Sequence, residues 1–293
     1  MLPDAVRREV EARLGAVRSA EPVGGGCINE TLRIDTERGP AFLKHHGSAP
    51  ARFFTAEAEG LAALAAAAGD EVRVPAVLAV SDDRAPGPAW IALEWLEPAP
   101  RAADFAERLG RGLAAIHRAR TGRWGWDAPN FIGSLPQENP AAPTWADFWR
   151  DHRLTPQLDL ARFKGRVPAT PPEWERLFDR LPELLAPAEE DGPSLLHGDL
   201  WGGNVLSAGG APALIDPAVY RGHREADLAM SELFGGFDAR FYAAYEEAWP
   251  LLPGYRDVRR GIYQLYYLLV HVNLFGGGYV SQTAETLRRV LAA

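Results

Sequence analysis

The stretch that decides the fold runs from Leu195 to Pro217 and reads LLHGDLWGGNVLSAGGAPALIDP. A His-Gly-Asp triplet ends in Asp199, Asn204 follows five residues later, and a short apolar run leads into Asp216. One carboxylate can orient or accept the proton of an attacking hydroxyl group, and an amide oxygen with a second carboxylate can hold Mg²⁺ against phosphate oxygens. The order therefore predicts Asp199 as the proton acceptor, and Asn204 and Asp216 as magnesium ligands, of an ATP-dependent phosphotransferase of the protein-kinase type.

Each piece of this pattern has an ordinary structural explanation when it is taken alone. An aspartate beside a Gly-rich turn, for example, is usually just a turn residue. The combination of the triplet, the asparagine at the right offset and the aspartate after a strand is much harder to obtain by accident. We therefore interpret the whole pattern as functional.

The composition indicates a soluble globular protein with one large or two modest domains. The 293 residues are 47% hydrophobic and 24% charged, and the net charge of -8 argues against a broad nucleic-acid-binding face. The N-terminal segment MLPDAVRREVEARLG lacks an apolar signal core, and the apolar stretch 61–68 is too short to span a membrane. We expect a cytoplasmic protein that binds neither nucleic acid nor membranes. The only cysteine, Cys27, excludes an internal disulfide.

The N-terminal part predicts the upper half of a nucleotide site. A helix over 2–14 precedes strands over 16–23, 30–35 and 41–44, and Gly24, Gly25 and Gly26 form the first turn. Glycines let backbone N–H groups approach phosphates closely, although the triplet alone also fits a simple hairpin turn. Lys44, one of only two lysines, ends the third strand and can reach the phosphates as a mobile charge.

A helix rich in Ala, Leu and Glu is predicted over 51–68. A glutamate on this helix could pair with Lys44 and fix its position. Glu57 is the first candidate because it shares a face with two apolar residues, and Glu59 is the second. The alternative is that both glutamates are solvated.

A hinge between two lobes is predicted where a strand runs into prolines. Strands over 72–80 and 89–96 follow the helix, and the second continues into Pro98-Ala99-Pro100. In such a hinge, backbone groups of Glu94, Trp95 and Leu96 would bind adenine. We therefore divide the chain into a nucleotide-binding lobe, 1–97, and a catalytic and substrate-binding lobe, 98–293. The predicted fold class is α+β, with an N-terminal antiparallel sheet lobe and a mainly helical C-terminal lobe.

The C-terminal part predicts helices over 102–118, 146–161 with a break near Pro156, 173–185, 225 onward, 238–248 and 256–275. The stretch 121–145 is expected to be irregular, and its aromatic residues Trp124, Trp126 and Phe131 could either line a substrate pocket or cover the core. Asp227 lies near a helix start and could accept backbone N–H groups of the catalytic loop, or simply complement the helix dipole.

Three polar side chains and the cysteine complete the candidates. We interpret His117, His271 and Asn273 as packed polar residues rather than ligands. Cys27 follows the glycines, and amide donors with Lys44 could lower its pKa and make it reactive. Such a thiol could form only an intermolecular disulfide, which would give a redox-dependent homodimer. The alternative is an inert thiol.

The chain resembles the fructosamine kinase (ketosamine-3-kinase) family, within the wider group of aminoglycoside phosphotransferases and choline kinases. The similar segments are GGGCINET (24–31), FLK (42–44), FFTAEAEGL (53–61), FIGSLPQEN (131–139), HGDLWGGNVL (197–206), DPAVYRGHREADLAMSELFGGF (216–237) and NLFGGGY (273–279). HGDLWGGN and GHREADLAM are the most specific of them. One small departure is Tyr220-Arg221, where the family more often has Tyr-Tyr.

The resemblance implies a two-lobed kinase-like fold with ATP and Mg²⁺ as cofactors. It implies transfer of the ATP γ-phosphate to the 3-hydroxyl of a ketosamine, followed by decay of the unstable product and release of the free amine. It also assigns the proton-acceptor role to Asp199, the metal to Asn204 and Asp216, and the phosphate-side ion pair to Lys44 and Glu57. The alternatives are a kinase for another small alcohol or amino sugar, and a non-catalytic ATP-binding regulator.

Overall fold

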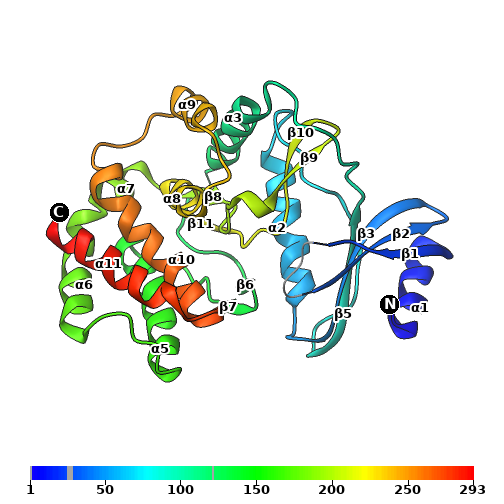
Figure 1. Cartoon of the computed structure of the whole chain (residues 1–293), viewed down its shortest axis with the longest axis horizontal. Coiled ribbons are helices and arrows are strands. Elements are labelled where there is room, and N and C mark those ends of the chain that lie inside the picture. Colours follow the sequence, from blue (N-terminus) through cyan, green and yellow to red (C-terminus); the bar gives the residue numbers. More distant parts are fainter. Residues whose placement is uncertain (1, 25–28, 121) are drawn as a thin grey trace.

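The computed structural model describes residues 2–24, 29–120 and 122–293. A five-stranded antiparallel sheet forms the N-terminal part, and helices make up most of the remainder (Figure 1). The strand order is β1-β2-β3-β5-β4. The strands are β1 (Val17–Pro22), β2 (Glu30–Thr36), β3 (Gly39–Ala49), β4 (Val77–Val80) and β5 (Gly87–Glu94).

Alternation along the strands gives this sheet two buried faces. Trp90 and Ala92 of β5 pack with residues of α1 (Asp4–Leu14), whereas Ile91 and Leu93 pack with residues of α2 (Phe53–Ala67). The two helices therefore cover opposite faces of the sheet, as Figure 1 also shows. Lys44 of β3 lies opposite Ile91 in the register, so its side chain projects toward α2.

The C-terminal part surrounds one large core of aromatic and aliphatic side chains. Its helices are α3 (Phe105–His117), α4 (Trp145–Trp149), α5 (Thr155–Phe163), α6 (Pro171–Leu184), α7 (Ala186–Asp191), α8 (Glu225–Phe234), α9 (Ala239–Ala248), α10 (Arg260–Leu274) and α11 (Gly278–Ala292), with π-helical turns at Arg150–Leu154 and Tyr255–Arg259.

Three short antiparallel strand pairs accompany these helices. They are β6 (Asn130–Ile132) with β7 (Leu135–Gln137), β9 (Val205–Ala208) with β10 (Ala211–Leu214), and β8 (Ser194–Leu196) with β11 (Tyr220–Gly222). A 3₁₀ turn at Gly202–Asn204 leads into β9. These strand pairs flank the segments that carry the predicted site residues Asp199, Asn204 and Asp216.

The structure differs from the sequence expectations in four places. The strand predicted over 72–80 begins only at Val77, because the backbone of Arg73 bonds to β10 instead (Arg73 N to Pro212 O 2.9 Å, Leu214 N to Arg73 O 2.9 Å). The predicted break near Pro156 lies earlier, in a π turn, since a proline in the first turn of α5 loses no hydrogen bond. The stretch 121–145 contains the β6–β7 hairpin, and helices α7 and α11 were not predicted.

Within residues 2–24, 29–120 and 122–293, no helix combines the length and the apolar character needed to cross a membrane.

Candidate active site

The catalytic-loop candidate begins at His197, directly after β8, and its backbone is fixed by a buried carboxylate. Asp227 in the first turn of α8 is fully buried and accepts hydrogen bonds from His197 N (2.7 Å) and Gly198 N (2.9 Å). His117 Nε2 lies 3.1 Å from the same carboxylate, and Tyr245 Oη lies 2.8 Å from His117 Nδ1. The predicted contact between Asp227 and the loop is therefore confirmed, and His117 is a packed residue that supports it.

The loop can turn only because Gly198 has no side chain. Its φ is +82°, and a Cβ at this position would lie 2.0 Å from the carbonyl oxygen of Ala218. The ring of His197 links both sides of this turn, since Nε2 donates to Ile215 O (2.9 Å) and Nδ1 accepts from Asp199 N (3.2 Å). Burial lowers the pKa of His197, which keeps the ring in this neutral tautomer.

Asp199, Asn204 and Asp216 form one hydrogen-bonded unit. Asn204 donates from Nδ2 to Asp199 O (2.9 Å), to Asp199 Oδ2 (3.2 Å) and to the Asp216 carbonyl oxygen (3.4 Å). Burial raises the pKa of Asp199 to about 7, with Asp216 and Asp227 adding to the rise and Asn204 opposing it. The three side chains predicted from the sequence therefore lie together.

The same unit fits a hard divalent cation. Because Asn204 donates through its amide nitrogen, its Oδ1 remains as an oxygen ligand, and the Asp216 side chain is 44% exposed. Asp216 has φ +55°, in the left-handed region that is uncommon for non-glycine residues and that recurs at active sites. In the described parts of the chain, no group of three or more histidine, cysteine or acidic side chains could hold a metal alone, so phosphate or water would have to complete the coordination.

Lys44 joins the sheet to this unit. Its Nζ lies 2.7 Å from Glu57 Oε1 and also contacts the carboxylate of Asp216. Burial by itself lowers the pKa of Lys44, but the two carboxylates outweigh it and hold that pKa above its usual value. The predicted pair with Glu57 is present, and Glu59 instead pairs with Arg52 (2.8 Å).

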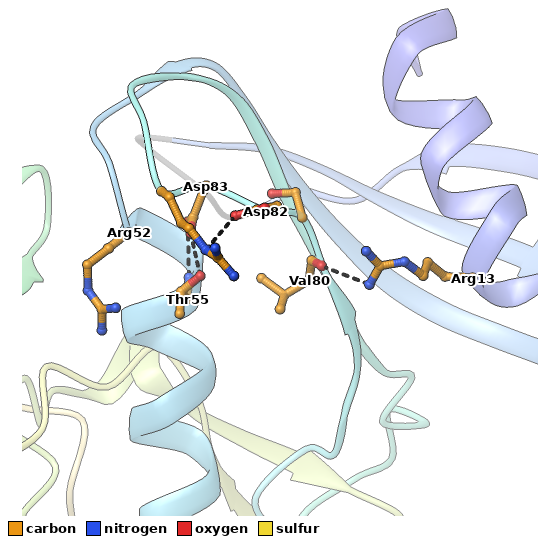
Figure 2. A pocket seen from close by; sticks show the side chains of 8 residues that line it. Arg13, Arg52, Thr55, Val80, Asp82 and Asp83 are labelled. Atoms are coloured by element: carbon orange, nitrogen blue, oxygen red, sulfur yellow. Dashed lines mark hydrogen bonds and ion pairs between the residues drawn. The ribbon is translucent and has the colours of Figure 1, made fainter.

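The start of α2 is anchored by a buried carboxylate that the sequence did not predict as part of the site. Asp83 in the β4–β5 connection accepts from Phe54 N (2.8 Å) and Thr55 N (3.1 Å), and it contacts the Thr55 hydroxyl. Figure 2 shows Asp83 and Thr55 facing one another beside a pocket that Arg13 and Val80 also line, and Arg13 Nη1 donates to Val80 O (3.4 Å). The volume of this pocket is about 440 Å³. This anchor fixes the helix that presents Glu57.

The hinge candidate packs against the segment that carries the metal-ligand candidates. Leu96 is buried with Ala208 and Ala213 of the β9–β10 hairpin. Two backbone bonds continue this contact, from Ala99 N to Ser207 O (3.3 Å) and from Gly209 N to Glu97 O (2.9 Å). The Glu94 side chain pairs with Arg73, and the Trp95 ring lies under the guanidinium of Arg33 at 5.2 Å.

All three aromatic candidates of the 121–145 stretch pack against hydrophobic cores. Trp124 is buried in the core, so covering the core is its role. Trp126 is only partly buried and lies beneath Arg221, 4.4 Å from the ring centroid, while Phe131 packs against Phe53 at 4.9 Å.

The two polar candidates on α10 have packing partners. Asn273 donates to Gln157 O and Oε1, both at 2.8 Å, and His271 Nδ1 lies 2.8 Å from Tyr267 O. Three residues of the Gly-rich region, Gly25, Gly26 and Cys27, lie outside the described residues, so their predicted roles stay predictions.

The sheet, the helical part and the arrangement of Lys44, Asp199, Asn204 and Asp216 define a protein-kinase-like phosphotransferase fold. The aminoglycoside phosphotransferase APH(4)-Ia, solved as a ternary complex of a thermostable mutant with ADP and hygromycin B, has the same fold (TM-score 0.60, 16% identity, 97% of this chain and 98% of that chain). The fold class predicted from the sequence is confirmed.

The model of the fructosamine kinase family matches residues 4–293, and the chain belongs to this family. It is 40% identical over 277 residues to a "Probable ketoamine kinase" of Synechocystis sp. (94% of this chain, 91% of the relative). It is 32% identical over 307 residues to the ketosamine-3-kinase of Mus musculus (96% and 97%). A Thermobifida fusca crystal structure described as "putative fructosamine-3-kinase" has a TM-score of 0.87 at 36% identity (99% and 100%).

Proposed function

We propose that this protein is an ATP-dependent kinase that phosphorylates the 3-hydroxyl of ketosamines such as fructosamines and ribulosamines. The observation that carries the proposal is the hydrogen-bonded unit of Asp199, Asn204 and Asp216, which faces Lys44 in a chain of this family. Relatives named ketosamine-3-kinase and protein-ribulosamine 3-kinase, which match over nearly the whole chain, support the substrate class.

We assign ATP to the junction between the sheet and the helical part. Gly24, Gly25 and Gly26 would approach the phosphates, and Lys44, held by Glu57, would neutralise their charge. Backbone groups of Glu94, Trp95 and Leu96 would bind the adenine. We also propose that the two lobes divide after residue 97, because every buried residue of the two cores on the sheet comes before this boundary. The large helical core draws most of its residues from after it, together with Leu64, Ala68 and Val72.

Asn204 and Asp216 would hold Mg²⁺ through one oxygen each. When bound, the ion supplies neutralisation of the charge on the phosphates and on the transferred phosphoryl group. Lys44 would add a second positive charge, and it is fixed by two carboxylates before ATP arrives. Because Lys44 is already held in place, it does not have to move during the reaction step.

Asp199 would accept the proton of the sugar hydroxyl and orient its oxygen toward the γ-phosphate. Its backbone is held on both sides, because Asp227 fixes the preceding residues and Asn204 donates to its carbonyl oxygen. A positioned base of this kind contributes about 10²–10⁴ in rate. The 3-phosphate product would then decompose and release the free amine, which is a deglycation.

Phosphorus NMR of the protein with Mg-ATP, fructosyl-lysine and ribulosyl-lysine tests this proposal, with the Asp199→Asn variant in parallel. We expect a new sugar-phosphate resonance with the wild-type protein, later release of lysine, and at least about a 10²-fold slower reaction with the variant. Near-normal turnover by the variant would remove the role of Asp199. ATP binding without any phosphorylated ketosamine would move the substrate to another small alcohol.

A further inference from the structure

A chain of buried side-chain amides lies beneath the segment that follows Asp216. Asn130, Gln137 and Asn139 come from the β6–β7 hairpin and the residues directly after it, and none is more than 6% exposed. Arg153 Nη2 donates to Asn139 Oδ1 (2.6 Å), Asn139 Nδ2 donates to Asn130 Oδ1 (2.9 Å), and Asn130 Nδ2 donates to Val219 O (2.7 Å). The chain thus runs from a guanidinium to a backbone carbonyl.

A second branch reaches the neighbouring carbonyl. Tyr266 Oη donates to Gln137 Oε1 (2.6 Å), and Gln137 Nε2 donates to Asn130 Oδ1 (2.8 Å) and to Ala218 O (3.2 Å). Two consecutive carbonyl groups, of residues 218 and 219, therefore receive hydrogen bonds from the same cluster of side chains.

The two ends of this chain of amides, the Arg153 guanidinium and the Val219 carbonyl group, fix the orientation of each amide. A guanidinium can only donate and a carbonyl oxygen can only accept, so Asn139 and Asn130 must each accept on one side and donate on the other. All the bonds then point away from the positive charge, and bonds aligned in this way strengthen one another in a low-dielectric interior.

Arg153 is an unusual starting point for such a chain. It is fully buried, yet no carboxylate in the described parts of the chain pairs with it. Its charge lies over the rings of Tyr220 (4.0 Å) and Phe148 (4.5 Å), and it also donates to the backbone oxygens of residues 138 and 152. A buried charge without a counter-ion is costly, so the hydrogen bonds and aromatic rings around Arg153 must offset that cost.

The far end of the chain meets the site. Residues 218 and 219 follow Asp216 after a single proline, and Ala218 N donates to His197 O (2.9 Å) at the start of the catalytic loop. The amides therefore bind the segment 218–219, and this segment connects the metal-ligand candidate Asp216 to the loop that carries Asp199.

We infer that four residues are positioning residues that hold Asp216 and Asp199 in place relative to one another: Asn130, Gln137, Asn139 and Arg153. None of them needs to touch a substrate, because they act through backbone carbonyls. This inference rests on the proposed function for the roles of the two aspartates.

The Asn139→Asp variant tests the inference. The carboxylate keeps the shape of the side chain and pairs with Arg153, but it can no longer donate to Asn130 Oδ1 or to the backbone oxygens of residues 128 and 137. We expect the melting temperature to stay within a few degrees of the wild-type value, while kcat falls about 10–100-fold and half-maximal activity needs more Mg²⁺. Affinity for ADP without Mg²⁺, measured by calorimetry, should not change, whereas the gain in affinity on adding Mg²⁺ should shrink.

Hydrogen exchange gives a readout that does not depend on the substrate. The variant should exchange faster in peptides covering 197–200 and 215–222, with little change elsewhere. The matched control is Asn273→Asp, which alters a buried asparagine near Lys164 and Arg166 in the same part of the molecule but has no contact with residues 216–220. We expect it to keep kcat and the Mg²⁺ dependence of the wild type.

Wild-type kcat, Mg²⁺ dependence and exchange in Asn139→Asp would overturn the inference. Faster exchange throughout the helical part, with equal losses in the Asn273→Asp control, would also overturn it by showing a general stability effect. If the wild-type protein phosphorylates no ketosamine, the proposed function fails separately, and the calorimetry and exchange results still decide the role of the amide chain.

Discussion

The hydrogen bonds that Asp227 accepts from the catalytic loop predict a loss of stability and of kcat in the Asp227→Asn variant. The wild-type carboxylate accepts from two backbone N–H groups and faces His117, and all of these groups are buried. An amide of the same shape can keep the bond to His197 with its oxygen. Its NH₂ group then faces the N–H of Gly198, so one bond is lost and two donors oppose each other.

The expected cost follows from these contacts. Losing a hydrogen bond to a charged acceptor costs about 1.5–3 kcal/mol, and an unsatisfied buried N–H group adds about 1–3 kcal/mol. Because part of this loss relaxes, we expect a fall of about 2–4 kcal/mol in the free energy of unfolding. For a chain of this size, that corresponds to a fall of about 3–7 °C in the melting temperature.

Urea unfolding followed by tryptophan fluorescence measures the free energy, and initial rates with Mg-ATP measure the effect on the loop. We expect kcat to fall with the stability, while ADP affinity stays near the wild-type value because the hinge is remote from Asp227 in the sequence and has its own contacts. An Asp227→Asn protein within about 0.5 kcal/mol of the wild type would refute the reasoning, since surface changes alone span that range.

Three further predictions concern single features of the site. Gly198→Ala should cost about 2–5 kcal/mol, from a left-handed φ and from a Cβ placed 2.0 Å from a backbone carbonyl oxygen; a soluble variant with wild-type activity would contradict it. Glu57→Gln should lower kcat/KM about 10²-fold because Lys44 loses one of its two anchors, and steady-state kinetics with varied ATP would check this. Burial lowers the pKa of His117 and His223 below the ordinary 6.5, so the folded chain resists protonation that the unfolded chain accepts. The free energy of unfolding should therefore fall below pH about 6.5, by up to about 1.4 kcal/mol per pH unit for each histidine. Replacing either histidine by Gln should make the melting temperature depend less on pH.

The contacts that the sequence predicted share a local origin. Alternation along β3 sends Lys44 to the face covered by α2, and the helical period of α2 presents Glu57 to it, so both periods are readable in the chain. A short loop separates Asp199 from Asn204 and one hairpin, β9–β10, separates Asn204 from Asp216, which leaves few ways to arrange the three residues. The position of Asp227 at a helix start likewise made its contact with the loop foreseeable.

The contacts that the sequence did not predict join segments that no motif or periodicity links. Asp83 anchors α2 from 29 positions away, and no periodicity links the two. The amides of Asn130 and Asn139 lie in a stretch that reads as an irregular loop, and their partner Arg153 sits in a π turn that no composition rule predicts. Long-range polar bonds depend on the final packing, so only the structure could reveal them.

The catalytic segment is held from two sides by opposite charges. On one side the buried carboxylate of Asp227 grips N–H groups, and its neighbour His117 stays neutral because burial lowers its pKa. On the other side the buried guanidinium of Arg153 acts through amides on C=O groups. The bond from Ala218 N to His197 O and the β8–β11 strand pair join the two segments that are held in this way.

This arrangement predicts coupling between the two grips. Residues that belong to one hydrogen-bond network deviate from additivity by about 0.5–3 kcal/mol. In a double-mutant cycle of Asp227→Asn and Asn139→Asp, the loss of kcat in the double variant should be smaller than the product of the single losses, because one released side already frees the shared peptide. Fully multiplicative losses would mean that the two side chains act on separate elements, and that the bond between residues 218 and 197 does not transmit their effects.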